Sequence, residues 1–177
     1  MIRPNQNLFI FIVSFVLLAA CSNPSSEESA DDSQVTSKAP AKQSSEEKNL
    51  ASVVDQYLLL KDALVASSPE ESKAKATDML GVIDATNMMG VQQSAKQIAT
   101  AADLETQRIY FDSLSVNLYK LLETQDGKNK TLYKQYCPMA FDNRGAYWLS
   151  NAEEIRNPYF GDQMLKCGRV EETIEYW

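Results

Sequence analysis

The sequence predicts a mainly α-helical domain. The expected arrangement is an antiparallel up-and-down four-helix bundle with a small C-terminal β-hairpin or sheet cap, whose loops carry cysteine and methionine. From Leu50 to Leu122 apolar residues recur with a period near 3.6, which is typical of amphipathic helices. After Gly127 the pattern changes to alternating β-type residues separated by turn signals. The short connections between the helices imply antiparallel neighbours.

The first two helices meet at a stop-and-start signal. Ser68 is a candidate N-cap, Pro69 fits the first helical position, and Glu71 completes a capping box. The second helix is expected to run to about Asp84. The expected core residues are Val53, Tyr57, Leu60 and Leu64 in the first helix, and Ala76, Met79, Leu80 and Ile83 in the second.

A break between Asn87 and Gly90 separates the second helix from the third. Asp103 is the predicted N-cap of the fourth helix. In that helix apolar residues recur every seven positions, as they do at the seam of a bundle. The expected core residues are Val91, Ala95, Ile98 and Ala102 in the third helix, and Leu104, Phe111, Leu114, Leu118 and Leu121 in the fourth.

The C-terminal part of the chain, about residues 131–177, reads as short strands and turns. Strands are expected at Thr131–Tyr136, Ala146–Leu149 and Val170–Tyr176. A second capping box at Ser150–Glu153 predicts a brief helical turn. Both cysteines of this region are expected in loops of the cap.

Composition excludes several functional classes. The chain has 177 residues, a formal charge of −7 and no histidine. Lys and Arg are scattered, so no basic face for nucleic acid is expected. Without histidine there is no Ser-His or Cys-His nucleophile system and no His-based zinc site. No phosphate loop and no paired carboxylates in a catalytic frame stand out, so we expect a protein that is not an enzyme and has no organic cofactor.

Residues 1–21 have the layout of a lipoprotein signal peptide. Arg3 is the only charged side chain, and Leu8 to Ala20 is an apolar run of 13 residues broken only by Ser14. This run is short for a membrane span, which needs about 20 residues. It ends in Leu-Ala-Ala-Cys, which resembles a bacterial lipobox. The resemblance implies cleavage before Cys21 and its acylation, which would anchor the chain in a membrane.

Residues 22–47 are predicted to be a disordered acidic tether. They contain eight serines, six acidic residues and two prolines, and Val35 is their only large apolar residue. Such a segment buries too little apolar surface to offset the entropy of ordering. Residues 48–177 then form the folded domain. We expect an exported protein held in the cell envelope by its lipid, at the outer membrane, facing either the periplasm or the cell surface.

Two cysteines remain once Cys21 is assigned to lipidation. Cys137 lies in YCPMAFDNRG and Cys167 lies thirty residues later in MLKCG. An even pair in an exported protein favours a disulfide. Closing a loop of about 30 residues could contribute about 3–4 kcal/mol in the chain-entropy model.

A methionine accompanies each cysteine, which supports a second interpretation. Met139 follows Cys137 by two residues, and Met164 precedes Cys167 by three, so the latter two would share a face if that segment were helical. Thiolates and thioethers are soft ligands that select Cu(I), and Ag(I) follows from the same argument. On these residues alone, a disulfide and a soft-metal site both stay open.

The strings YCPMAFDNRGAYWLS and IRNPYFGDQMLKCGRV resemble the signature of a family of bacterial exported domains of unknown function. These domains occur alone on lipoproteins and fused to periplasmic adaptor subunits of copper/silver efflux pumps. The upstream YLLLKDALVAS and LETQRIYFDSLSVNLYKLL are similar to the family's helical part, so the resemblance covers about residues 50–175. It implies a heavy-metal context and a metal site at Cys137, Met139, Met164 and Cys167.

One departure from related heavy-metal modules narrows the ligand set. Cys-Pro-Met is followed by histidine in those modules and by Ala140 here, which leaves a sulfur-only site. We therefore expect a membrane-tethered lipoprotein that binds Cu(I) or Ag(I) and buffers it or hands it on beside heavy-metal efflux components. The alternative is an envelope interaction module in which Cys137 and Cys167 form a structural disulfide.

The residues around the cysteines have structural roles in this interpretation. The aromatic side chains are expected to form a hydrophobic wall that seats the loops on the bundle. Asn157-Pro158 is expected only to set a turn. Gly145, Gly161 and Gly168 are expected to adopt positive φ or to allow close approach of two segments. The aromatic residues concerned are Tyr147, Trp148, Tyr159 and Phe160.

Overall fold

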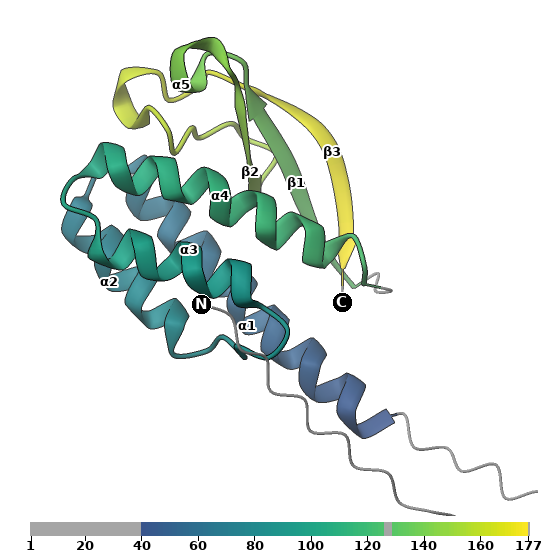
Figure 1. Cartoon of the computed structure of the whole chain (residues 1–177). Coiled ribbons are helices and arrows are strands. Elements are labelled where there is room, and N and C mark those ends of the chain that lie inside the picture. Colours follow the sequence, from purple (N-terminus) through teal and green to yellow (C-terminus); the bar gives the residue numbers. More distant parts are fainter. Residues whose placement is uncertain (1–39, 126–128, 177) are drawn as a thin grey trace, which may run out of the picture. The chain divides into compact units, whose positions relative to one another are not determined.

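The computed structural model describes residues 40–125 and 129–176, with side chains from residue 49 onward (Figure 1). Four long helices are followed by a small antiparallel sheet, which confirms a mixed, helix-dominated domain. The helices are α1 (Pro40–Val65), α2 (Pro69–Leu80), α3 (Met89–Thr100) and α4 (Leu104–Leu122). The strands are β1 (Lys130–Cys137), β2 (Ala146–Ser150) and β3 (Arg169–Tyr176), with the short helices α5 (Ala140–Asn143) and η1 (Gly161–Gln163) between them.

The helices bury the faces that their periodicity predicts. Each helix packs against the next one along the chain, and α4 also packs against β2. Tyr57 joins α1 to α4, because its ring stacks on Phe111 of α4 with centroids 5.0 Å apart. The predicted core residues that are fully or almost fully buried are Val53, Tyr57, Leu60, Leu64, Ala76, Met79, Val91, Ala95, Ile98, Phe111, Leu114 and Leu118.

The start of α1 differs from the prediction. The helix begins at Pro40, so the predicted end of the tether at residue 47 lies inside it. Proline is favourable at the first helical position, because its missing N–H would have no partner there. The residues that follow include Ala, Lys, Gln and Glu, which have high helix propensity. The acidic, serine-containing composition that suggested a coil is therefore compatible with a helical extension.

Other helix ends also differ from the prediction. Ser68 is the N-cap residue of α2 and Pro69 its first residue, as predicted, but the Ser68 side chain makes no capping hydrogen bond. Instead the hydroxyl and N–H of Ser72 donate to the Ser68 carbonyl. α2 stops at Leu80, because Gly81 follows and the chain turns. Ala102 lies beyond the end of α3 and is exposed. Near the end of α4, the fully packed residue is Leu122, while the predicted Leu121 is only partly buried.

The three strands form one antiparallel sheet with β1 in the middle and order β2-β1-β3. All three predicted strands are present, each extended by one or two residues. Side chains alternate between the two faces of a strand. On one face Lys134 and Tyr147 contact Tyr119 of α4. On the other face Gln135 lies opposite Trp148, under the segment 151–168 that connects β2 to β3.

This connecting segment contains little regular structure. The helical turn predicted at Ser150–Glu153 is absent: Ser150 ends β2, and its hydroxyl accepts from the N–H of Ala152 in a bend. The bend lets the carbonyl of Ala152 accept from Gln135. Met164 and Cys167 are not on one α-helix either, because η1 ends at Gln163 and a turn follows.

Candidate functional site

The structure brings the two cysteines of the domain into contact. The Sγ atoms of Cys137 and Cys167 lie 2.6 Å apart although the residues are 30 positions apart in the chain. Cys137 is completely buried, whereas Cys167 is partly exposed. Cys137 is the last residue of β1 rather than a loop residue, and Cys167 precedes β3. The register that pairs Tyr136 with Arg169 places both cysteines at the same end of the sheet.

Gly168 makes this approach of the two segments sterically feasible. Its φ is +149°, a backbone conformation that residues other than glycine rarely adopt. A Cβ at this position would lie 2.9 Å from Cη2 of the Trp148 ring and 3.0 Å from the Tyr136 carbonyl oxygen. The chain therefore passes directly over the tryptophan as it leaves Cys167. Positive φ at Gly145 and Gly161 confirms the role expected for the other two glycines.

Asn157 holds the Cys167 turn in place, which the sequence analysis missed. It is fully buried, and its Nδ2 donates to the Cys167 carbonyl at 2.8 Å. Its N–H donates to the Leu165 carbonyl, while its Oδ1 accepts from the N–H groups of Tyr159 and Phe160. Asn before Pro was expected only to set a turn. A signal that could have identified the larger role is an asparagine that begins a largely apolar run, since such a side chain must find partners when it is buried.

The segment after Cys137-Pro138 forms an unusual left-handed turn. Phe141, Asp142 and Asn143 have φ of 51°, 57° and 66°. Asn and Asp tolerate this region better than other non-glycine residues, which explains two of the three. Arg144 secures the turn to α4 through an ion pair with Asp112 at 2.8 Å. Asp142 and Asn143 therefore act as turn formers here.

The two methionines near the cysteines are both at least partly exposed to solvent. The side chain of Met139 is 48 % exposed, and its backbone N–H donates to the Cys167 sulfur. Met164 is partly buried, and its carbonyl accepts from the N–H of Cys167 at 3.0 Å. Within residues 49–125 and 129–176, no hydrogen bond joins a thioether to either thiol. The backbones of both methionines therefore support Cys167.

The surroundings of Cys167 keep its thiol protonated at neutral pH. Burial, followed by the hydrogen bond and the charge repulsion of Cys137, raises the pKa of Cys167 to about 11. The N–H of Met139 opposes this shift, because it stabilises the thiolate. A metal ion that binds here must displace the proton of Cys167, so binding would release acid and strengthen as the pH rises.

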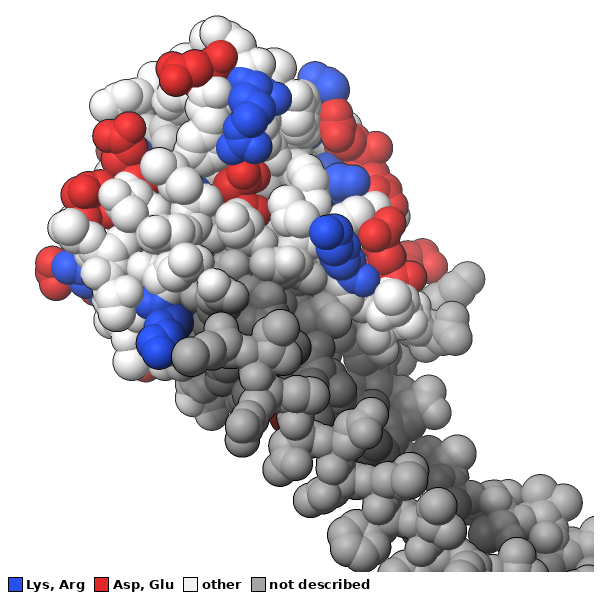
Figure 2. All heavy atoms as spheres, in the orientation of Figure 1, with Lys and Arg blue, Asp and Glu red and all other residues white. Residues whose placement is uncertain are grey.

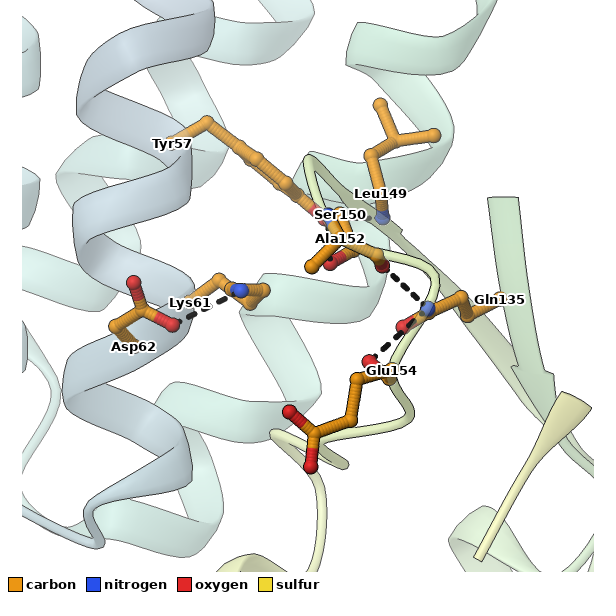
Figure 3. Close-up of polar contacts among 8 residues, drawn as sticks. All are labelled: Tyr57, Lys61, Asp62, Gln135, Leu149, Ser150, Ala152 and Glu154. Carbon is orange, nitrogen blue, oxygen red and sulfur yellow. Dashed lines mark hydrogen bonds and ion pairs between the residues drawn. The ribbon is translucent and has the colours of Figure 1, made fainter. Parts of the chain in front are cut away.

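Buried polar groups bind the connecting segment to the sheet and the sheet to α1 (Figure 3). The Nε2 group of Gln135 donates to the carbonyls of Ala152, Glu153 and Glu154 at 2.8–3.3 Å. On the helix side, the Tyr57 hydroxyl accepts from the Leu149 N–H at 3.0 Å. Burial raises the pKa of Tyr57 well above its ordinary value. The sheet that carries Cys137 is thus held by hydrogen bonds to the connecting segment on one face and to α1 on the other.

Aromatic side chains pack against this sheet, as expected. Trp148 is fully buried and meets Tyr159 edge-on with ring centroids 5.9 Å apart. Tyr159 also contacts the rings of Phe111 and Phe141. Its hydroxyl donates to the Tyr147 carbonyl at 2.6 Å. These four rings therefore form one packed aromatic cluster.

Charged side chains on the viewed face are interspersed, with acidic groups gathered over β3 (Figure 2). Glu171, Glu172 and Glu175 of β3 are exposed. Among the described residues, no group of three or more Cys, Asp or Glu side chains could hold a metal ion. In the same part of the chain, no helix is long and apolar enough to cross a membrane. Cys21, the signal peptide and most of the tether lie outside the described residues.

Comparisons with known proteins found a family that is similar to the helical part of the chain. Residues 53–130 match the sequence model of a family described as a protein of unknown function, DUF3347. No match was found among curated proteins or among solved structures. The matched region runs from α1 to the first residue of β1, so Cys137 and Cys167 lie outside it. The helical part of this chain is therefore similar to a domain family of unknown function.

Proposed function

We propose that this protein is an exported, lipid-anchored lipoprotein whose folded domain binds one Cu(I) or Ag(I) ion at Cys137 and Cys167. The observation that supports the proposal most strongly is the meeting of two thiols from distant segments, each with a methionine close by in the chain. Such a set matches the preference of soft monovalent ions for sulfur. The pairing of each helix with the next supports an up-and-down bundle as the scaffold.

The proposed mechanism is exchange of ligands without enzymatic chemistry. The two thiols supply negative charge and affinity once they lose their protons. Met139 is exposed enough to meet an incoming ion before it reaches the buried Cys137. Met164 would complete the sulfur set after a local adjustment of its turn. The domain would buffer the ion in the cell envelope or hand it on to heavy-metal efflux components, and it would not bind nucleic acid.

A Cu(I) titration of the reduced full-length protein against a coloured chelator tests the proposal. All variants carry Cys21→Ala, so that only the domain thiols are present. We expect one Cu(I) per chain, and Cys137→Ser or Cys167→Ser should weaken binding by more than about 100-fold, since even changes outside the ligand set cost 10–100-fold. Met139→Leu should weaken binding by about tenfold.

Met89→Leu is the matched control, because Met89 is also exposed but lies on α3. Its Cu(I) affinity should equal that of the parent protein. Equal affinity in the parent protein and in both cysteine variants would exclude this site as the location of the ion. The same titration at several pH values should show tighter binding as the pH rises toward the raised pKa of Cys167.

The second candidate function is an envelope interaction module with a Cys137–Cys167 disulfide. The sulfur separation of 2.6 Å favours it, because two thiolates that each lie about 2.3 Å from one tetrahedral ion are roughly 3.8 Å apart. A mass measurement under non-reducing conditions distinguishes the two candidates. A mass two hydrogens lower than that of the reduced chain, together with no uptake of Cu(I) after reduction, would favour the interaction module.

A further inference from the structure

The two cysteine residues differ in their exposure to solvent. Cys137 is completely buried at the end of β1, whereas Cys167 is partly exposed in the turn before β3. A reagent from solution can therefore meet Cys167 before any opening of the fold, and it can meet Cys137 only after a local opening. Thiol chemistry depends on such access as well as on the thiolate.

From this asymmetry we propose that Cys167 is the exchange thiol and Cys137 the resolving thiol of a redox-active pair that reacts with low-molecular-weight thiols and disulfides. The proposal rests on the cysteine pair of the proposed function but requires no metal. The contact between the two Sγ atoms means that a group attached to Cys167 is within immediate reach of Cys137.

The reaction with glutathione disulfide has two steps. Cys167 first loses its proton to water, in the small fraction of molecules that carry the thiolate at neutral pH. The thiolate attacks one sulfur of glutathione disulfide, a bond forms between them, and a glutathione thiolate leaves with the electron pair of the broken S–S bond. Cys137 then loses its proton to water and attacks the Cys167 sulfur, which forms the Cys137–Cys167 bond and releases the second glutathione thiolate. Two protein thiols are oxidised and one glutathione disulfide is reduced, and the two released protons neutralise the two thiolates.

Two cationic residues lie close to Cys167 in the chain. Lys166 and Arg169 flank it in the chain, with side chains 64 % and 60 % exposed. Their partners Glu154 and Glu171 are themselves exposed, so these ion pairs hold the cations only weakly. Asn157 fixes the Cys167 carbonyl and thereby keeps the sulfur facing Cys137. Glutathione carries carboxylates that such cations attract at short range.

Single-cysteine variants of the full chain test this assignment without metal. All carry Cys21→Ala; one adds Cys137→Ser and the other Cys167→Ser. Each is reduced, mixed with glutathione disulfide, and followed by mass spectrometry for the mixed disulfide. We expect Cys167 in the first variant to react at least about tenfold faster than Cys137 in the second, because only Cys137 must await local opening. In denaturant the two rates should become equal.

A second measurement covers the case in which a variant does not fold. The reduced Cys21→Ala protein, with both domain thiols, receives less than one equivalent of iodoacetamide, and peptide mapping locates the label. Label concentrated on Cys167 supports the proposal. Equal labelling, or label concentrated on Cys137, overturns it. Because no metal is present, either outcome is independent of the Cu(I) titration, and failed Cu(I) binding with normal exchange would overturn only the proposed function.

Discussion

At the scale of single residues, Gly168 decides whether the cysteine pair can form. The chain reverses at Cys167 and enters β3 within two residues, and it does so in contact with the Trp148 ring. The φ of +149° and the absence of a side chain are both needed there. A change at this residue therefore acts on the fold and on the separation of the sulfurs together.

Gly168→Ala should destabilise the protein by about 1–3 kcal/mol, because the added Cβ overpacks against Trp148 and the backbone is strained. Urea unfolding of the reduced protein measures this change in the free energy of unfolding. Gly81→Ala is the matched control, since Gly81 has an ordinary φ of −70°. A loss in the control as large as that in Gly168→Ala would show that the effect is not specific to this position.

At the scale of elements, the start of α4 shows how one capping residue fixes the end of a helix. The Asp103 carboxylate accepts from the Thr106 N–H at 2.7 Å. This hydrogen bond to the charged form lowers the pKa of Asp103. A group with a lowered pKa in the folded state contributes stability above its unfolded pKa and loses that contribution as the pH falls through its folded pKa.

Asp103→Ala should therefore lower the melting temperature at pH 7, and the difference from the parent protein should shrink below about pH 4, where the carboxyl group gains a proton. Asp103→Asn separates capping from charge, because Asn caps as well as Asp but does not titrate. It should retain most of the stability at pH 7. Thermal unfolding at both pH values tests this, and a difference that is independent of pH in Asp103→Ala would contradict the assigned cause.

The elements were largely predictable from the sequence, whereas the site was predictable only in part. The periods of about 3.6 and 2 predicted four helices and three strands, because burial on one face imposes those periods. The contact between Cys137 and Cys167 depends on the register of β1 against β3, which no local pattern encodes. Asn157 was misjudged for the same reason, because its partners are supplied by the path of the chain up to Cys167.

At the scale of the whole domain, Tyr57 joins the helices to the sheet. It lies on α1, stacks on Phe111 of α4, shares a hydrogen bond of 2.7 Å with Ser115, and accepts from Leu149 of β2. Helices and sheet therefore share one buried contact point. Loss of this hydroxyl should weaken both parts at once.

Tyr57→Phe should lower the free energy of unfolding by about 1–3 kcal/mol, because the buried N–H of Leu149 loses its partner. Far-ultraviolet circular dichroism follows the helices, and tryptophan fluorescence in a Trp177→Phe background follows Trp148 in the sheet. The two midpoints should shift together. Separate midpoints would mean that the helices and the sheet unfold independently.

The position of β3 at the edge of the sheet has a consequence for contacts between copies of the protein. Its outer side has no strand beside it in the described residues, and unpaired edge groups invite strand addition from another molecule. Glu171, Glu172 and Glu175 place exposed charged side chains along that strand, and Glu171 and Glu172 form ion pairs with Arg169 and Lys134. A strand from a second copy that added to β3 would have to accommodate these charged side chains, so the edge is protected against edge-to-edge association.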